Sequence, residues 1–578
     1  MGIKPKRLLA WTALLLLGTV ALATVAGLTF RVALGPVVQS SAPDAVYAPH
    51  GVVATSQPLA SQAGLQVLQQ GGNAVDAAVT AAAVLNVVEP YMTGLGGDMF
   101  AILWSEREQR LVGINGSGRA GTLMTRDAVG GSVQTSGAKS ITIPGALSGW
   151  AALLENYGTI TLAEALRPAV VLAEEGFPVS KTTAKEWALF ADDLKAHPGA
   201  RDTYLIDGER APRVGEWFSN PDLARTMQAI ADEGPGLLYG GALGQSIAEH
   251  VQELGGFLTN EDFATHRSEW VEPLSVSFQN HRLWELPPNG QGIAALEMLR
   301  LLESYDLASM GHNSVTYLHH LVEAKKLAYA DLEHFVGDPE FMSIAPERLL
   351  ADDFITMRRA HLNPGRALQH AAPDRSLTNS ETTYLAVADE EGNMISFINS
   401  LGGPFGSGVV VPGTGFALQN RAEGFSIREG RANTAGPGRR PFHTIIPGFV
   451  TKTAPDGKQQ PWLAFGVVGG PQQPQAHVQV LLNILLFDMD VQQALDAPRF
   501  RHWRASSVTF ETSIPESTIA ELHSMGHRTQ DPLMEVGSIL LVGENMGLIF
   551  GGGKAIMRND RGYIAGSDSR RDGLAAAH

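Results

Sequence analysis

The sequence contains no cysteine. This absence excludes a disulfide scaffold, a thiolate zinc site, an iron–sulfur cluster and a cysteine nucleophile. Basic residues are also scarce: 43 Lys and Arg stand against 59 Asp and Glu, a formal net charge of −16. We therefore expect no nucleic-acid or anionic-membrane partner. The rest is typical of a globular chain, with 44% hydrophobic and 18% charged residues, and its 63 glycines and 32 prolines predict many turns in a mixed α and β fold.

Several common motifs for phosphate, metal and nucleophile sites are missing as well. There is no GxxxxGK[ST], no HExxH and no GxSxG. Residues 116–121 match GxGxxG, but no plausible helix start follows them, so we interpret them as a glycine-rich loop. His319 and His320 are adjacent on a predicted helix and face different directions, which makes them a poor metal pair.

The N-terminus has the pattern of a targeting segment. Lys4, Lys6 and Arg7 precede an uncharged run over residues 8–30, which would span roughly 34 Å as a helix, enough for a bilayer core. The basic flank favours an extracytoplasmic location for the rest of the chain, in the periplasm or on the outer face of the membrane. Residues 1–31 are thus predicted as a signal anchor or, with a small-residue site at 21–23, a cleaved signal peptide. Residues 32–50 are predicted as a linker.

Beyond residue 50, helical and strand-like patterns alternate. From about residue 162 to residue 368, amphipathic helices are predicted to alternate with short strands, and from Glu381 strand patterns dominate, with a hairpin around the turn 389–393. The expected helices are 60–70, 76–88, 162–175, 314–332, 476–486 and 517–525, and the expected strands are 100–104, 383–388, 394–398, 462–468, 507–510 and those around 539–541. Strand-rich segments flanked by helices on both sides indicate layered α+β packing.

A set of polar and glycine-rich motifs follows one another in a specific order. They are GNAVDAAV at 72–79, GLGGD at 94–98, ETTYLAV at 381–387, FGSG at 405–408, RPFHTIIP at 440–447 and VVGGPQ at 467–472. In this order they resemble the γ-glutamyltransferase (glutathione hydrolase) family, from about residue 50 to the C-terminus. The resemblance implies the N-terminal-nucleophile (Ntn) hydrolase fold, a four-layer αββα sandwich, in a precursor that cuts itself just before a threonine.

The resemblance identifies that threonine as Thr382 and the scissile bond as Glu381–Thr382. Residues 51–381 would form the large subunit and residues 382–578 the small subunit, and the two fragments would remain one domain. A threonine hydroxyl is a weak nucleophile that needs a base. Cleavage frees the α-amino group of Thr382, whose ordinary pKa near 8 suits proton abstraction. An acyl-enzyme would then pass to water or to an acceptor amine, so no metal or organic cofactor is implied.

Three further positions carry over from the family. Gly469 and Gly470 match glycines whose backbone N–H groups form an oxyanion hole, where each donor contributes roughly 3–4 kcal/mol. Ser400 matches a threonine whose hydroxyl orients the nucleophile.

The expected substrate pocket departs from the family pattern. The arginine that typical members use for the substrate α-carboxylate falls at Gly116 or Ser117, and the nearby Arg119 is the candidate substitute. The aspartate that takes the α-ammonium is replaced at Gly424, with Glu423 one residue earlier. A pocket asparagine is Gly402, and a serine pair reads His443-Thr444. Our substrate-binding candidates are Arg119, Glu423, His443 and Thr444.

Three functions follow from these residues. The first is a self-processing γ-glutamyl hydrolase or transferase acting on glutathione-like amides through Thr382. The second is an acylase of other small-molecule or peptide amides, similar to cephalosporin acylases. The departures of the substrate pocket from the family pattern favour this function. The third is a non-catalytic, membrane-tethered binding protein on the same scaffold. Hydrolysis of a γ-glutamyl anilide against another acyl anilide separates the first two, and an uncut chain indicates the third.

Overall fold

The computed structural model describes residues 44–369, 381–529 and 549–578. The predicted targeting segment 1–31 and the strands expected around 539–541 lie outside these ranges. Within them, every helix is too short or too polar to cross a membrane. Residues Asp44–His578 form one unit by their internal contacts.

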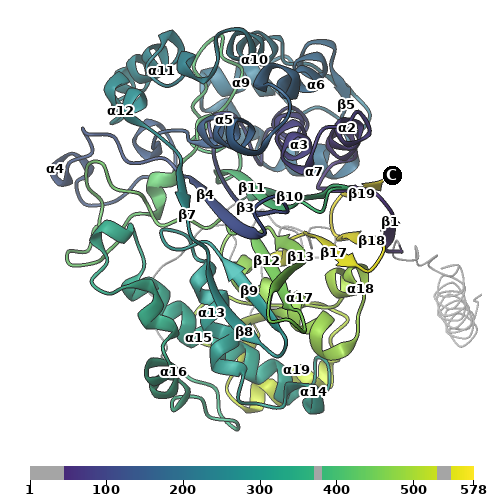
Figure 1. Ribbon diagram of the computed structural model, residues 1–578. Coiled ribbons are helices and arrows are strands. Elements are labelled where there is room, and N and C mark those ends of the chain that lie inside the picture. The colour runs from purple at the N-terminus through teal and green to yellow at the C-terminus, as the bar shows by residue number, and fades with distance from the viewer. Residues whose placement is uncertain (1–43, 370–380, 530–548) are drawn as a thin grey trace, which may run out of the picture. The chain divides into compact units, whose positions relative to one another are not determined.

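Two seven-stranded sheets form the centre of this unit, and all neighbouring strands in both are antiparallel (Figure 1). The first sheet runs in the order β1 (Val46–Ala48), β18 (Gly562–Ser567), β17 (Gly553–Asn559), β13 (Gln459–Val467), β12 (Gly448–Thr453), β9 (His281–Glu285) and β8 (Leu274–Phe278). The second runs β19 (Leu574–Ala577), β2 (Val52–Thr55), β10 (Glu381–Ala388), β11 (Met394–Gly402), β3 (Asp98–Ser105), β4 (Arg110–Gly116) and β7 (Glu269–Val271).

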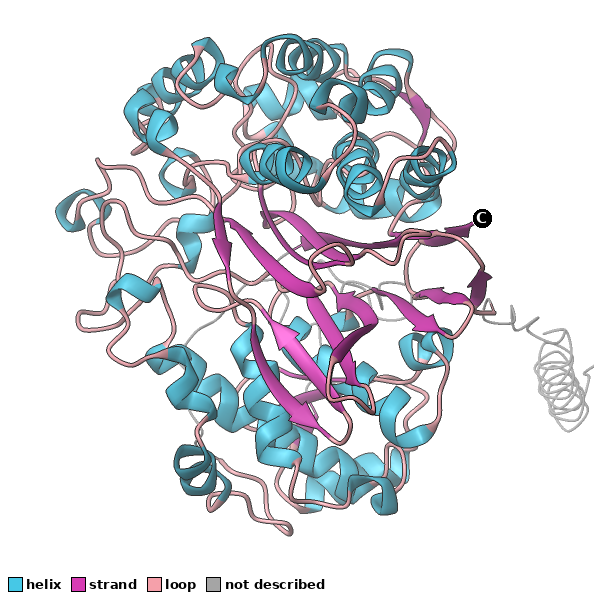
Figure 2. Ribbon diagram, viewed as in Figure 1, coloured by secondary structure: helices cyan, strands magenta, loops and turns pink. Residues whose placement is uncertain are grey.

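Helices cover the outer face of each sheet (Figure 2). Those packed with the second sheet are α2 (Pro58–Gln69), α3 (Ala74–Val88), α5 (Ala146–Tyr157), α6 (Leu162–Glu175), α7 (Lys181–Leu189), α8 (Ala191–Lys195), α9 (Pro198–Tyr204), α10 (Pro221–Glu233), α11 (Ala242–Glu253) and α12 (Asn260–Thr265). Those packed with the first sheet are α13 (Gly292–Leu302), α14 (Leu307–Met310), α15 (Val315–Phe335), α16 (Asp352–Arg359), α17 (Gln472–Phe487), α18 (Val491–Asp496) and α19 (Glu516–Ser524).

The smaller elements lie outside these layers. They are α4 (Arg126–Val129), the strand pair β5 (Phe177–Pro178) and β6 (Trp217–Phe218), the three-stranded sheet β14 (Phe500–His502), β15 (Ser507–Phe510) and β16 (Arg528–Thr529), and the 3₁₀ turns η1 (Ala138–Ser140), η2 (Pro235–Leu237), η3 (Pro339–Phe341), η4 (Pro346–Leu350) and η5 (Arg421–Gly424).

Separate apolar cores fill the spaces between the layers. The core between the two sheets contains Phe100, Tyr384, Ile398 and Phe449, while Leu385 and Phe397, one residue along their strands, lie in the core under the helices of the second sheet. Successive side chains of a strand point to opposite faces, so these strands are buried on both sides. The layer order is therefore helix, sheet, sheet, helix, as the resemblance implies.

Local sequence explains the elements nearest the centre. Asn73 and Asp76 form a reciprocal capping box at the start of α3, and all residues of this alanine- and valine-rich helix are buried. The hairpin between β10 and β11 turns at Gly392, whose φ of 101° suits only glycine well. Both sheets contain strands from both sides of the expected cut, hydrogen-bonded to one another, and this arrangement supports fragments that stay together.

One boundary prediction is wrong at its end. The linker predicted over residues 32–50 includes β1, whose Val46 and Ala48 pair with Ala565 and Tyr563 at the edge of the first sheet. The pairing with β18 holds these residues in the sheet, whereas a run of three residues is too short to show the alternating pattern by which a strand is recognised from sequence.

Candidate active site

Thr382 is the second residue of β10 and is fully buried. Glu381 pairs with Gly402 and Thr383 with Asn399, so the register of the hairpin shifts opposite Thr382. Such bulges re-aim side chains and are common beside active sites. Ser400, on the opposing strand, accepts a hydrogen bond from the Thr382 hydroxyl over 3.2 Å. The structure thus brings together the predicted nucleophile and the hydroxyl predicted to orient it.

The Ser400 hydroxyl oxygen accepts hydrogen bonds from three donors. Besides Thr382, the backbone N–H of Gly402 donates to Ser400 Oγ over 3.0 Å, and Nη2 of Arg421 donates over 2.5 Å. Arg421 also donates from Nη1 to Thr444 Oγ1 over 2.9 Å. A charged donor on a hydroxyl makes a short, strong hydrogen bond, so Arg421 fixes the position of Ser400 relative to Thr382.

Arg421 is buried among groups that only partly offset its charge. Burial lowers the pKa of its guanidinium to about 10, against the opposing influence of Asp98 and Glu423. The Asp98 carboxylate lies 3.9 Å from Nε, beyond hydrogen-bond reach. Even at the lowered pKa, Arg421 stays cationic at neutral pH.

Asp98 is held by other donors. Its Oδ1 accepts from the backbone N–H groups of Gly118 and Gly145, and its Oδ2 accepts from His443 Nε2 over 3.0 Å. Because the backbone N–H of Ile445 donates to Nδ1 of His443, the proton of this imidazole is assigned to Nε2. Burial, and then Arg421, lowers the pKa of His443 to about 4, so the ring is neutral above that pH.

Gly469 and Gly470 form the turn between β13 and α17. Their φ angles of 122° and 56° lie in the region that favours glycine. The amide of Gln291 ties this turn to the site, since its Nε2 donates to the carbonyl oxygens of Gly470 and Thr444 over 2.8 and 2.5 Å. A continuous set of hydrogen bonds therefore joins the predicted oxyanion glycines to Thr444, Arg421, Ser400 and Thr382.

The other two substrate-binding candidates are placed differently. Glu423 lies in η5, two residues after Arg421 in the chain. The Arg119 side chain belongs to a separate ion cluster, within 3.3 Å of Asp338, Glu269 and Glu340. Three carboxylates already surround this guanidinium, so the geometry favours Arg421 over Arg119 as the cation of the site.

Sequence reasoning missed Arg421, Asp98 and Gln291. Asp98 ends a motif that the sequence singled out, and Arg421 is the only charged residue between Val409 and Ala422. A single cation in a long uncharged stretch is the signal that could have identified it. Gln291 carries no comparable signal.

The three glycines that replace family pocket residues are closely packed. A Cβ at Gly116, Gly402 or Gly424 would come closer than 3.0 Å to the Met99 carbonyl oxygen, the Asn420 side-chain oxygen or the Phe442 carbonyl oxygen, respectively. Gly402 also has a φ of 98°. These positions leave no room for the arginine, asparagine and aspartate of the family pattern, because neighbouring atoms occupy the space.

A second polar cluster involves one of the histidines considered in the sequence. His319 Nδ1 and His527 Nε2 lie 2.8 Å apart, and Glu323 lies beside them, so three potential metal ligands converge in a buried place. Lys326 Nζ donates to Glu323 over 2.7 Å. The two imidazoles hydrogen-bond each other and Lys326 pairs with the Glu323 carboxylate, while Nδ1 of His527 has no hydrogen-bond partner among the described residues.

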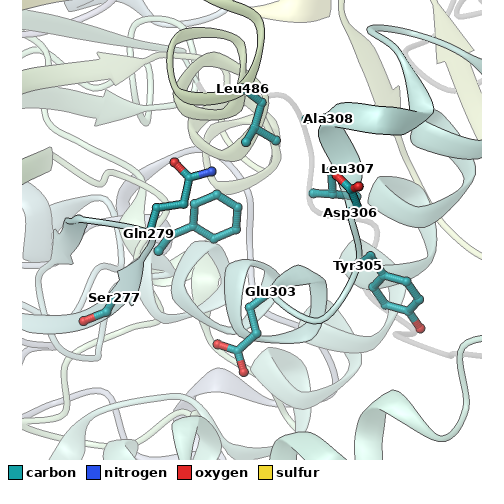
Figure 3. A pocket seen from close by; sticks show the side chains of 9 residues that line it. Ser277, Gln279, Glu303, Tyr305, Asp306, Leu307, Ala308 and Leu486 are labelled. Atoms are coloured by element: carbon teal, nitrogen blue, oxygen red, sulfur yellow. The ribbon is translucent and has the colours of Figure 1, made fainter.

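A pocket of about 270 Å³ lies apart from these residues (Figure 3). None of the predicted site residues lines it. Its lining comes from β8, the loop after it, the end of α13, α14 and α17, and consists of Ser277, Phe278, Gln279, Glu303, Tyr305, Asp306, Leu307, Ala308 and Leu486.

Proteins with a similar sequence include glutathione hydrolase and acylase proenzymes. The sequence profile described as gamma-glutamyltranspeptidase matches residues 60–578. The glutathione hydrolase-like YwrD proenzyme of Bacillus subtilis (strain 168) is 38% identical over 531 residues, which are 89% of this chain and 96% of that protein. The acylase ACY 1 proenzyme of Pseudomonas sp. (strain SE83) is 34% identical over 492 residues, 83% of this chain and 87% of that one.

Among solved structures, a cephalosporin acylase from Bacillus halodurans superposes with a TM-score of 0.86 at 41% identity, covering 94% of this chain and 99% of that one.

Proposed function

Because the chain belongs to the gamma-glutamyltranspeptidase family, we propose that it is a self-processing amide hydrolase with Thr382 as its N-terminal nucleophile. The observation that carries this proposal is the hydrogen bond between Thr382 and Ser400 at the bulge of a buried strand pair. Further hydrogen bonds, through Arg421 and Gln291, connect this pair to the Gly469–Gly470 turn. The names of its relatives, which are proenzymes, support the same reading.

Self-processing uses the groups that surround Thr382. Its hydroxyl attacks the carbonyl carbon of Glu381, the C–N bond to Thr382 breaks, and an ester joins Glu381 to Thr382 Oγ1. Water then hydrolyses the ester, which leaves a Glu381 carboxylate and a free Thr382 α-amino group. Ser400, held by Arg421 and Gly402, fixes the hydroxyl for attack.

The mature enzyme repeats the chemistry on a substrate amide. The freed α-amino group takes the proton of the Thr382 hydroxyl, which attacks the substrate carbonyl. Backbone N–H groups of Gly469 and Gly470 stabilise the oxyanion, and the base returns the proton to the leaving amine. Water, or an acceptor amine, then releases the acyl group from Thr382.

The altered pocket favours an acylase over a γ-glutamyl-specific enzyme. A γ-glutamyl group needs an anion for its α-ammonium, because a desolvated charge requires a partner. The position of the family aspartate is Gly424, where a Cβ would collide with the Phe442 carbonyl. Similarity to a cephalosporin acylase and to acylase ACY 1 supports this choice. Glutathione hydrolysis is the second candidate, favoured by the 38% identical relative whose name includes it.

The test is the intact mass and N-terminal sequence of the purified protein. Wild type is expected to give two fragments, the smaller of which is residues 382–578 and begins Thr-Thr-Tyr. Thr382→Ala is expected to remain one chain, and Thr383→Ala is the matched control. Thr383 carries the same hydroxyl one residue away but bonds the backbone of Asn399, so this variant should still be cut before Thr382. An uncut wild-type chain would refute the proposal and favour the binding-protein hypothesis.

A further inference from the structure

Two histidines and one glutamate form a buried group in the helical layer of the first sheet. His319 and Glu323 lie one turn apart on α15, so their side chains leave the same face of the helix. His527 comes from the turn between α19 and β16, and α19 packs against α15 in the same layer (Figure 1). Each of the three residues is no more than 2% exposed, and their ligand atoms all lie within 4.8 Å of one another.

The hydrogen bonds of His319 leave one lone pair directed into this group. Its Nε2 lies 2.7 Å from the carbonyl oxygen of Asn363, which can only accept, so the ring proton is assigned to Nε2. In the neutral imidazole, Nδ1 then carries a lone pair, and it faces Nε2 of His527 over 2.8 Å. A backbone carbonyl that holds the other N–H is a typical partner of a metal-binding histidine.

His527 can present a second lone pair to the same point. Its Nε2 donates to His319, and its Nδ1 is buried without a hydrogen-bond partner among the described residues. Only the bond to His319 therefore favours the proton on Nε2 over Nδ1. When the proton moves from Nε2 to Nδ1 of the same ring, lone pairs of both histidines face each other, and a cation between them is needed to offset their repulsion.

Glu323 supplies the third ligand and is itself held in place. Its Oε2 accepts a hydrogen bond from the backbone N–H of Leu368 over 2.8 Å, and its Oε1 accepts one from Lys326 Nζ over 2.7 Å. Each carboxylate oxygen has two lone pairs, so each keeps one for a metal ion. Carboxylates that bind metals are usually hydrogen-bonded in this way, because the second partner fixes their orientation.

The donor set selects the kind of ion. Two imidazole nitrogens and one carboxylate suit zinc and neighbouring transition metals, whereas calcium and magnesium require mainly oxygen ligands. The charge balance favours the same choice. Because Glu323 is already paired with Lys326, charge alone attracts a cation only weakly, and the ion must form strong bonds to the imidazole nitrogens.

The three ligands come from both sides of the expected cut. His319 and Glu323 precede the bond between Glu381 and Thr382, and His527 follows it. An ion bound to all three would connect the large fragment to the small one after the peptide bond between them is broken.

We propose that His319, Glu323 and His527 bind one zinc ion, and that this ion stabilises the association of the two fragments. The role is structural, because the nucleophile of the proposed function uses its own α-amino group as the base. The bridging part rests on the proposed function, since it assumes the cut before Thr382, whereas the binding of the ion does not depend on it.

Cobalt(II) is the probe, because it occupies zinc sites and absorbs visible light when nitrogen ligands bind it. The untagged protein is produced in minimal medium supplemented with Co²⁺, so that the ion is present while the buried site folds. We expect one cobalt ion for each wild-type chain, with a visible absorption band, and one zinc ion when the medium contains Zn²⁺ instead. Supplementing with Ca²⁺ or Mg²⁺ should leave neither ion bound at this site.

Variants of the two histidines test the ligands. His319→Gln and His527→Gln should lose the absorption band and most of the bound metal. His320→Gln is the matched control, because it makes the same change at a buried position of the same helix outside the group of three, and it should keep the metal. A wild type without bound cobalt, or equal metal contents in His527→Gln and His320→Gln, would overturn the proposal.

Thermal unfolding of the processed protein tests the bridging role. Zinc at about 100 times its dissociation constant should raise the wild-type midpoint by about 2 °C for a chain of this size, and a chelator should reverse the shift. The His319→Gln and His527→Gln midpoints should not respond to zinc, whatever their values without it. Bound metal with no shift in the wild type would refute the bridging role. An uncut wild-type chain that holds one cobalt ion would instead refute the proposed function and leave the metal site in place.

Discussion

Gly424 offers the sharpest test of the idea that close packing excludes the aspartate with which typical family members bind the substrate α-ammonium. In the variant Gly424→Ala, the new Cβ would lie closer than 3.0 Å to the carbonyl oxygen of Phe442, whereas non-bonded atoms prefer about 3.5 Å or more. Relief requires the two segments to separate. Asn433 resists this, because its amide donates to the Gly424 carbonyl over 2.5 Å and its oxygen accepts from the Phe442 N–H over 2.9 Å.

The expected loss combines two contributions. Overpacking typically destabilises by 1–3 kcal/mol, and weakening one hydrogen bond adds about 1 kcal/mol. We expect Gly424→Ala to reduce stability by about 2–4 kcal/mol and Gly424→Asp by at least as much. Gly424→Asp should also fail to gain γ-glutamyl hydrolysis, because its carboxylate enters by distorting the site.

Thermal unfolding followed by fluorescence, with parallel anilide assays, measures both effects. Gly131→Ala is the matched control: it makes the same change where no atom lies within 4 Å of the added Cβ, so its midpoint should equal that of wild type. A Gly424→Asp protein with a wild-type midpoint and increased γ-glutamyl turnover would refute the reasoning, because it would show that the pocket can accommodate the acid.

Three further predictions concern the hydrogen bonds of the site. Ser400→Ala should slow self-cleavage by about 10–100-fold, whereas Ser400→Thr, which keeps the hydroxyl, should stay near wild type; the rate at which the smaller fragment appears on a gel measures this. Gln291→Ala should lower kcat several-fold with little change in KM, because Gly470 loses its anchor; an unchanged kcat would contradict that role. Stability should fall as the pH drops from about 6.5 towards 4. His443 has a folded-state pKa of about 4, so in this pH window its side chain takes up a proton only in the unfolded chain. The denaturation midpoint should therefore depend less steeply on pH in His443→Gln than in the wild type.

Much of the framework could be predicted from the sequence. The helix over 162–175 and the strand over 507–510 are confirmed to the residue, and the hairpin around 389–393 is found where strand patterns met an acidic, glycine-containing turn. Apolar periodicity and turn residues are local features of the chain, so the elements they specify can be predicted from the sequence alone. The pairing of Thr382 with Ser400 was also accessible, because the two residues face each other across one hairpin.

The residues that were missed depend on long-range packing. Gln291, in the loop before α13, donates a hydrogen bond to the carbonyl oxygen of Gly470. Asp98, the first residue of β3, accepts one from His443, which lies in the loop before β12 of the other sheet. No local pattern encodes these meetings. The same holds for Arg119, which sequence proximity made a candidate and which folding places among three carboxylates.

The glycines that replace the family's charged pocket residues and the buried cation Arg421 are best understood together. The buried Arg421 guanidinium would repel a substrate ammonium placed beside it, and at Gly424 the close approach of the Phe442 carbonyl prevents the acid that would hold an ammonium. Arg421 and the backbone N–H of Gly402 both donate hydrogen bonds to the Ser400 hydroxyl, so the cation and one of the packed glycines belong to the same group around the nucleophile. A double variant, Arg421→Gln with Gly424→Asp, should not add the two single effects: removing the cation lessens the repulsion of an ammonium, so γ-glutamyl turnover relative to glutaryl turnover should rise more than in either single variant. Simple additivity of the two logarithmic changes would show that the residues act independently.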